Sequence, residues 1–184
     1  MATSLIEKKK YTYEDYLKTP DDKRYELIEG ELLMTPSPIT NHQRISGRIE
    51  FELRKFVSEN DLGEVFDAPY DVHLDDENVV QPDMMFISKG RSKIIGEKNL
   101  QGAPDLVVEI LSESTAYRDL IQKKKLYAKF GVKEYWIVVP EEKTIDIYSL
   151  KDNSYLSYKS YGKDATLEST SLRGFRIELK GIFK

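Results

Sequence analysis

The 184-residue chain contains no cysteine and only two histidines, His42 and His73. Without cysteine it forms neither disulfide bonds nor thiolate zinc sites, and so few histidines argue against a histidine-based metal centre. A cytoplasmic protein is therefore expected. Long apolar runs are missing as well, so no segment is expected to span a bilayer, and the first ten residues lack the apolar centre of a signal peptide.

Common catalytic signatures are absent too: there is no G-x-S-x-G elbow, no Walker loop and no G-x-G-x-x-G turn. The 28 basic residues against 32 acidic ones give a net charge of −4. That balance argues against a general nucleic-acid coat, which needs many Lys and Arg contacts to phosphate, but it is compatible with a nuclease whose acidic site holds a metal ion. Length and composition fit a single domain over residues 1–184, with residues 1–11 as a flexible tail.

Two acidic residues stand in the apolar stretches in the middle of the chain. Asp83 directly precedes the run 84–87, and Glu109 interrupts a second run on the strand face that carries Val107 and Leu111. Burying an unpaired carboxylate is very costly, so a positively charged partner for Glu109 is expected.

A helix predicted from about Thr115 to Phe130 supplies that partner. Ser114 or Thr115 is expected to cap its start, and Gly131 to end it. Helical spacing predicts a buried stripe of Ala116, Leu120, Tyr127 and Ala128. The opposite, solvated side is predicted to carry Arg118, Gln122, Lys125 and Lys129. Lys123 lies beside the stripe and Lys124 on its inner half, so at least one lysine is expected to face the two acids.

Two acids on neighbouring strands and an inward lysine are typical of metal-assisted phosphodiester hydrolysis. The carboxylates of Asp83 and Glu109 would hold a hard divalent cation, and the lysine would stabilise developing negative charge. The alternative is a structural ion pair between Glu109 and Lys123, with Asp83 only bonding nearby amides at the start of a strand. The second acid favours the metal site, because one lysine cannot neutralise two carboxylates whereas a divalent ion can.

Other segments carry further candidate residues. Glu29-Gly30 predicts a β-hairpin, in which Glu26 is either an additional metal or water ligand or an ordinary glutamate paired with Arg24 or Lys23.

A helix is predicted over about residues 40–60, with a buried stripe of Ile45, Ile49, Leu53 and Phe56. His42 and Gln43 fall in the first turn of this helix, where free backbone amides favour anions, so both are candidates for phosphate contact. The alternative for His42 is a purely structural role, filling space at the start of the helix. The polar segment 89–102 is either a mobile DNA-contacting loop at the mouth of the site or a solvated connection.

Several motifs occur together from about Tyr13 to the end of the chain. They are RYELIEGEL at 24–32, NHQRI at 41–45, APYDV at 68–72, QPD at 81–83 and APDLVVEILS at 103–112. Arg118, Asp119, Lys123, Tyr127, Gly131 and the EYW step at 134–136 complete the set. Through these motifs the chain resembles the Uma-two family of putative restriction endonucleases, in the PD-(D/E)XK nuclease superfamily.

The resemblance implies an α/β fold with a restriction-endonuclease-like mixed central β-sheet flanked by helices. It implies that Asp83, Glu109 and the main-chain carbonyl of Ile110 bind Mg²⁺ or Mn²⁺ for the hydrolysis of DNA. The superfamily lysine is expected at position 111, which is Leu111 here, and the resemblance places it at Lys123, with Lys124 as the alternative. A homodimer is left open. So are two other functions: a catalytically idle nucleic-acid-associated protein, and a regulatory or structural domain without an enzymatic role.

Overall fold

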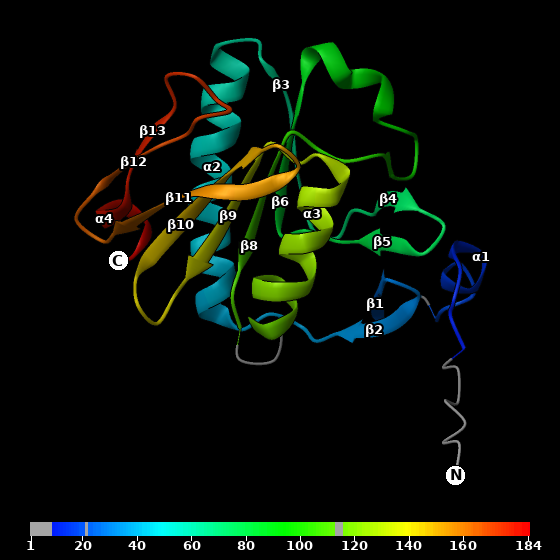
Figure 1. Ribbon diagram of the computed structural model, residues 1–184. Coiled ribbons are helices and arrows are strands. Elements are labelled where there is room, and N and C mark those ends of the chain that lie inside the picture. The colour runs from blue at the N-terminus through cyan, green and yellow to red at the C-terminus, as the bar shows by residue number, and fades with distance from the viewer. Residues whose placement is uncertain (1–8, 21, 113–115) are drawn as a thin grey trace.

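The structure, a computed structural model, describes residues 9–20, 22–112 and 116–184 (Figure 1). In chain order its first elements are α1 Tyr13–Tyr16, β1 Arg24–Ile28, β2 Glu31–Thr35, α2 Thr40–Glu59, β3 Gly63–Asp67, β4 Val72–Asp75, β5 Asn78–Val80 and β6 Met84–Ser88. The 3₁₀-helix η1 Lys89–Ile94, β7 Leu100–Gln101 and β8 Leu106–Ile110 follow. The π-helical segment η2 Arg118–Lys123 leads directly into α3 Lys124–Phe130. The chain continues with β9 Glu134–Val139, β10 Thr144–Lys151, β11 Ser154–Gly162, β12 Thr166–Glu168, β13 Arg176–Glu178 and α4 Leu179–Ile182.

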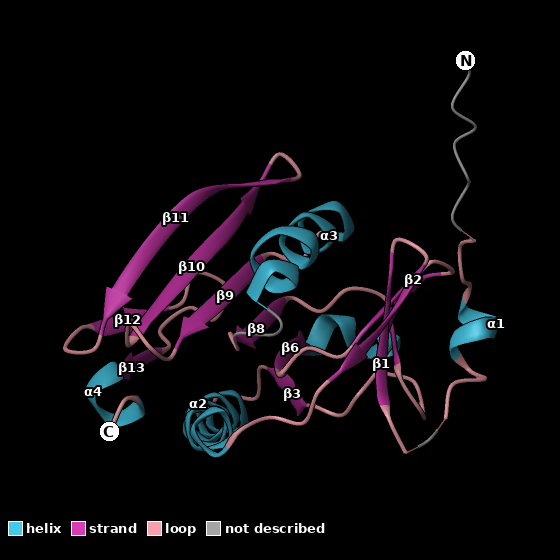
Figure 2. Cartoon of the chain, turned by 90° about the horizontal axis from the view of Figure 1, so that it is seen from below, coloured by secondary structure: helices cyan, strands magenta, loops and turns pink. Residues whose placement is uncertain are grey.

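A mixed six-stranded sheet forms the centre, with strand order β11-β10-β9-β8-β6-β3. Strands β8 and β9 are parallel, and the other neighbours are antiparallel. Figure 2 shows α2 and α3 on opposite faces of this sheet. A second sheet, β2-β1-β5-β4-β7, lies beside it, and β12 pairs with β13. The predicted α/β architecture is therefore confirmed. None of the described helices has the length and apolarity needed to cross a membrane.

The buried face of α2 repeats every four residues and packs against one side of the central sheet. Its members Ile45, Ile49, Leu53 and Val57 are each at most 2 % exposed. Phe56, predicted as the last member of this stripe, is only partly buried, because the spacing of four continues to Val57. On the opposite side of the sheet, Leu126 and Tyr127 of α3 pack on Val107, Tyr135 and Ile137.

The predicted hairpin brings an acidic residue to the centre of the molecule. Glu29 and Gly30 have φ of 51° and 80°, as a two-residue hairpin turn requires, and Glu26 pairs with Leu33 across it. Strand β1 also pairs with β5 through Leu27 and Val79. Since β5 leads directly into the Gln81-Pro-Asp83 segment, this pairing places Glu26 beside the start of β6.

The polar segment 89–102 does not line the cleft, so of its two predicted roles the DNA-contacting loop at the mouth of the site is wrong. Asp83 precedes β6 and Lys89 follows it, so five strand residues at about 3.3 Å each, roughly 16 Å, separate the two. The segment forms η1 and β7 and then enters β8 at the same far end of the sheet. Sequence adjacency to Asp83 was misleading because a strand carries the chain away from its own start.

One acidic residue at that far end should control stability at low pH. Asp105 is 2 % exposed, accepts a hydrogen bond from the Ser88 amide at 2.8 Å and forms ion pairs with Lys133 (2.7 Å) and Arg91 (3.3 Å). Burial tends to raise the pKa of Asp105, but Lys133, Ser88 and Arg91 outweigh burial and lower the pKa. A lowered folded-state pKa gives stability above the unfolded pKa, about 3.9, and that stability is lost as pH falls through the folded value.

Asp105→Asn is therefore expected to reduce the free energy of unfolding at pH 7 by about 1–3 kcal/mol and to cost less at pH 3, because below about pH 3.9 the unfolded wild type takes up a proton at this carboxylate and the advantage of its charge shrinks. Urea unfolding at both pH values measures the difference. Asp61→Asn is the control, because Asp61 forms an ion pair with Lys89 but its side chain is 80 % exposed. An equal cost of Asp105→Asn at both pH values would contradict the prediction.

Candidate active site

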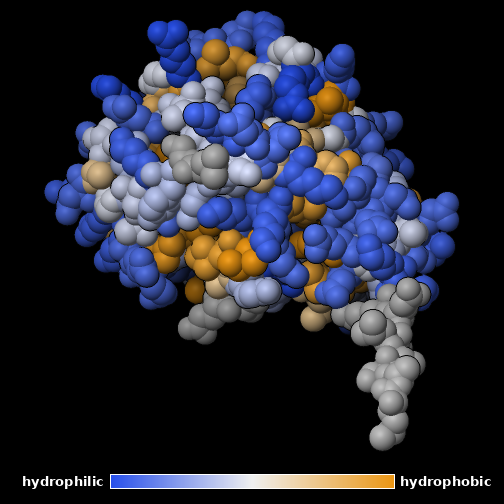
Figure 3. Space-filling view, in the orientation of Figure 1, coloured by the Kyte–Doolittle hydropathy of each residue, from blue (hydrophilic) through white to orange (hydrophobic). Residues whose placement is uncertain are grey.

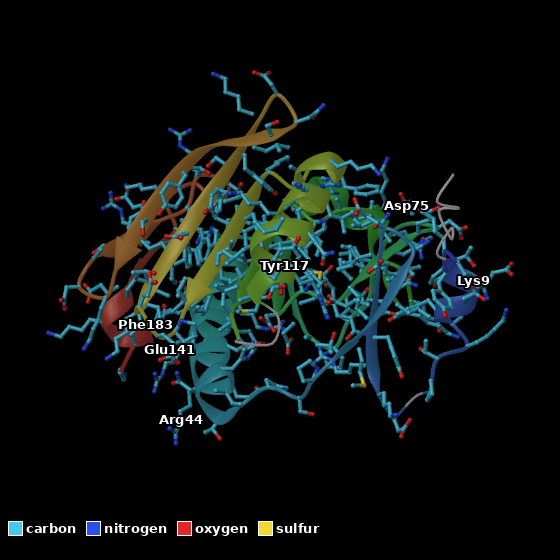
Figure 4. All side chains as sticks on the ribbon, turned by 60° about the horizontal axis from the view of Figure 1, so that its bottom comes forward. Lys9, Arg44, Asp75, Tyr117, Glu141 and Phe183 are labelled. Atoms are coloured by element: carbon cyan, nitrogen blue, oxygen red, sulfur yellow. The ribbon has the colours of Figure 1, made fainter. Side chains whose placement is uncertain are left out.

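A cleft of about 270 Å³ opens where β1, β6 and β8 meet the starts of α2 and η2. It is lined by Arg24, Glu26, Thr35, Pro36, Ser37, Pro38, Ile39, His42, Gln81, Asp83, Glu109, Ile110, Ser112, Asp119 and Lys123. Figure 4 brings this end of the molecule forward, with Arg44 of α2 and Tyr117 labelled there. Sequence-predicted candidates from five separate segments thus meet in one place.

Lys123 is the centre of the charged network. Its ammonium lies 2.8 Å from Glu26 Oε1, 2.9 Å from Glu109 Oε1 and 3.3 Å from Asp119 Oδ1, and the residue is 4 % exposed. Lys124 points elsewhere, with its ammonium 3.6 Å from the centroid of the Tyr148 ring. Between the two candidate lysines, the structure places Lys123 among the acids.

Arg118 also reaches this network, although it was predicted on the solvated side of its helix. Its Nη1 lies 3.1 Å from Glu26 Oε2 and donates to Thr35 Oγ1 at 3.4 Å. Leu120, predicted in the buried stripe, is 37 % exposed. The predicted cap at Ser114 or Thr115 lies outside the described residues.

The π-helical turn explains both errors about η2. At 3.6 residues per turn, five residues would place Arg118 and Lys123 about 140° apart around an α-helix. The wider π turn, about 4.4 residues, reduces that angle to about 50°. Both cations therefore face Glu26, whereas Leu120 rotates outward.

Asp83 and Glu109 each contact the described residues through one of their two carboxylate oxygens. Asp83 Oδ2 accepts the Ile110 amide at 2.7 Å and lies 3.1 Å from His42 Nε2. Glu109 Oε1 accepts the hydroxyl of Tyr127 at 2.7 Å as well as Lys123. Within the described ranges no residue donates to Asp83 Oδ1 or Glu109 Oε2.

The carboxylate oxygens of Asp83 and Glu109 suit one class of metal ion. In the described part of the chain, no three His, Cys, Asp or Glu side chains are grouped as metal ligands. Two carboxylates lining one cleft fit Mg²⁺ or Mn²⁺, which keep several waters, better than an ion that needs a full set of protein ligands.

The two buried glutamates differ in their affinity for a proton. Burial raises the pKa of Glu109 well above its usual value, and Asp119, Asp83 and Glu26 raise it further against the opposing charge of Lys123. Burial acts on Glu26 in the same direction, but Lys123, the Gln81 amide and Arg118 outweigh it and lower the pKa of Glu26. Burial tends to lower the pKa of Lys123, yet Glu109, Glu26 and Asp119 together raise it. Lys123 is therefore charged, and Glu26 is its firmest partner.

The pairings considered for Glu26 from sequence are not what the structure shows, whereas Glu109 does pair with Lys123. Glu26 is paired with neither Arg24 nor Lys23: its Oε1 accepts the Gln81 amide at 2.9 Å, and Arg24 donates to the Gln81 side chain at 3.0 Å. Among the described residues, four acidic side chains line the cleft, against Arg24 and Lys123 in its lining and Arg118, which reaches Glu26 from beside it. The cleft therefore has more acid than a structural ion pair between Glu109 and Lys123 would require.

Some site residues have roles that sequence reasoning did not assign. Asp119 lies one turn before Lys123, and the i,i+4 spacing of opposite charges was a usable signal. Tyr127 was predicted only as a packing residue, and its bond to Glu109 depends on the tertiary fold. His42 lies on Asp83, while Gln43 is exposed beside it.

Comparisons with known proteins agree with this architecture. The sequence matches the family Uma2, described as "Putative restriction endonuclease", over residues 13–180. A crystal structure of a putative nuclease belonging to DUF820 from Anabaena variabilis superposes with a TM-score of 0.79 at 20 % identity, covering 94 % of this chain and 97 % of that one. At that identity the likeness establishes the fold. No curated protein matches the chain.

Proposed function

The chain belongs to the Uma2 family of putative restriction endonucleases, and we propose that it is a metal-dependent nuclease that hydrolyses DNA phosphodiester bonds in the cleft around Asp83, Glu109 and Lys123. The excess of carboxylates in this cleft supports the proposal most directly. Asp83 and Glu109 each have one oxygen that no described residue bonds, beside a lysine held in a fixed position.

Asp83, Glu109 and the main-chain carbonyl of Ile110 would hold Mg²⁺ or Mn²⁺, which when bound polarises the phosphate and lowers the pKa of a water molecule. The protein fixes the orientation of both carboxylates. The Ile110 amide and His42 hold Asp83 Oδ2, and Tyr127 with Lys123 holds Glu109 Oε1. Partners of this kind keep metal-binding groups in a single geometry.

Lys123 acts on the phosphate. Its nearly buried ammonium lies beside Glu109 and stabilises the negative charge that develops on the phosphate oxygens during attack by water. Both oxygens of Glu26 are already bonded, to Lys123, Gln81 and Arg118. We therefore assign Glu26 a positioning role through Lys123, in place of the ligand role considered from sequence.

Cleavage assays test the activity and the substrate. Purified protein is incubated with supercoiled DNA, or with RNA of matched sequence, in Mg²⁺, Mn²⁺ or chelator. DNA cleavage in either metal and none in chelator is the expected result. No cleavage of DNA in any condition would overturn the proposal, and cleavage of RNA alone would show that the substrate is RNA and not DNA.

We also propose that the protein is cytoplasmic. A homodimer stays a prediction.

Thermal melting tests the metal site without a substrate. Mg²⁺ at ten times its dissociation constant is expected to stabilise the wild type by about 1.4 kcal/mol, a rise in melting temperature of roughly 3–6 °C for a domain of this size. Asp83→Asn should lose most of that rise. In chelator the variant should be at least as stable as the wild type, because the charge of Asp83 acts unfavourably on Glu109.

The control variant for the melting curves is Glu59→Gln, which removes an exposed acidic charge at the end of α2. It should respond to Mg²⁺ as the wild type does. An equal Mg²⁺ response in the Asp83 variant, or an Asp83 variant clearly less stable than wild type in chelator, would instead favour a structural role for the cluster.

A further inference from the structure

A second groove, of about 400 Å³, runs along α3 and carries only basic charges. One wall consists of Leu120, Ile121, Lys124, Lys125, Ala128 and Lys129, and the other of Asn153, Ser154 and Tyr155. The helical wall has two rows at i,i+4 spacing, one through Ile121, Lys125 and Lys129. In Figure 3, the view of Figure 1 in which α3 faces the viewer, this side of the molecule is mostly hydrophilic with smaller hydrophobic patches.

The charge of this groove is opposite to that of the whole protein. Three lysines line it and no carboxylate does, in a chain with a net charge of −4. Lys124 lies over the Tyr148 ring. Burial lowers the pKa of Lys124, and the nearby carboxylate of Asp146 partly opposes that effect. Lys125 and Lys129 are exposed and form no ion pair with any residue the structure describes. Two ammonium groups are therefore available to an anionic ligand.

The position of the groove connects it to the catalytic cleft. Lys123, which faces the cleft, directly precedes Lys124 in the chain, so one helix carries both sites. Lys125 and Lys129 are four residues apart, about 6 Å along the helix axis, a step comparable with that between neighbouring phosphates of one strand. Leu120 and Ile121, 37 % and 42 % exposed, add apolar surface at the end nearest the cleft.

We propose that this groove binds the sugar–phosphate backbone of the nucleic-acid substrate beside the cleavage site. Lys125 and Lys129 contact phosphates that are not cut, and the apolar side chains of Leu120 and Ile121 pack against sugars. This inference rests on the proposed nuclease function. It adds a substrate-binding surface outside the cleft, because a polynucleotide held at Asp83 and Glu109 must continue across the neighbouring surface.

Binding measured at several salt concentrations tests the groove. A short labelled DNA duplex is titrated with protein carrying Asp83→Asn, in chelator, so that no strand is cut and no metal is required. Each lost phosphate contact lowers the slope of log K against log salt by about 0.9. Lys125→Ala/Lys129→Ala should therefore lower the slope by about twice that amount, and each lysine lost should weaken binding roughly 8-fold at 0.1 M salt.

The matched control is Lys55→Ala/Lys180→Ala, which removes two exposed lysines from α2 and α4, outside both sites. It should change the salt slope far less. An unchanged slope in the groove variant, with normal DNA binding by its parent, would overturn the groove and leave the nuclease proposal standing. No DNA binding by the parent would overturn the groove, and the cleavage assay decides the nuclease proposal separately. Loss of binding to an acidic peptide, but not to DNA, would assign the groove to a protein partner and overturn the proposal.

Discussion

Glu109→Gln is expected to abolish DNA cleavage, a loss of at least about 10³-fold, and Asp83→Asn should do the same. Each change removes a charge that would hold the metal ion, whose contribution to transition-state stabilisation is several kcal/mol. The amide oxygen of Gln keeps the shape of the side chain and still accepts hydrogen bonds from Tyr127 and Lys123. The measurement is the single-turnover rate of DNA cleavage in saturating Mg²⁺.

Two observations separate a catalytic effect from loss of the fold. The circular-dichroism spectrum of each variant should match the wild type, and Glu59→Gln, on the exposed end of α2, should cut DNA at the wild-type rate. If Glu109→Gln or Asp83→Asn cuts as fast as wild type, these residues are not the metal ligands. If Glu59→Gln loses activity as well, the assay is reporting net charge.

Asp83 and Glu109 were identifiable from sequence because each conflicts with its surroundings. A carboxylate in or beside an apolar run is costly, and the structure shows what compensates it: the Ile110 amide for one, and Lys123 with Tyr127 for the other. The hairpin at Glu29-Gly30 was predictable for a local reason, because Gly30 readily adopts the positive φ of 80° that the turn requires there.

The full environment of Lys123 was not predictable, because its partners come from distant parts of the chain. Glu26 reaches Lys123 only through the pairing of β1 with β5, a long-range arrangement that no local pattern encodes. Arg118 was predicted on the wrong face because periodicity assumes 3.6 residues per turn, and a π turn breaks that phase. Both failures occurred within the candidate site, where local rules are most often broken.

Lys123→Ala should have the largest combined effect of any single substitution, on stability as well as on activity. Removing this ammonium leaves Glu26, Glu109 and Asp119 without their shared cation at positions that are at most 3 % exposed. Breaking a buried ion pair in this way costs about 3–5 kcal/mol of unfolding free energy. Cleavage by the remaining folded protein should fall roughly 10²–10⁴-fold, because the phosphate loses its charge stabiliser.

Urea unfolding and single-turnover cleavage, both at a temperature where the variant stays folded, measure the two effects. Lys124→Ala is the matched control: it removes a neighbouring charge that lies over Tyr148, and it should cost about 1 kcal/mol and little activity. The double variant Glu26→Gln/Lys123→Met separates loss of catalysis from misfolding. Because it removes a buried anion together with the cation, it should recover stability without recovering cleavage. If Lys124→Ala proves the worse variant, the catalytic role belongs to Lys124. If the double variant cleaves DNA at the wild-type rate, the ammonium of Lys123 has only a structural role.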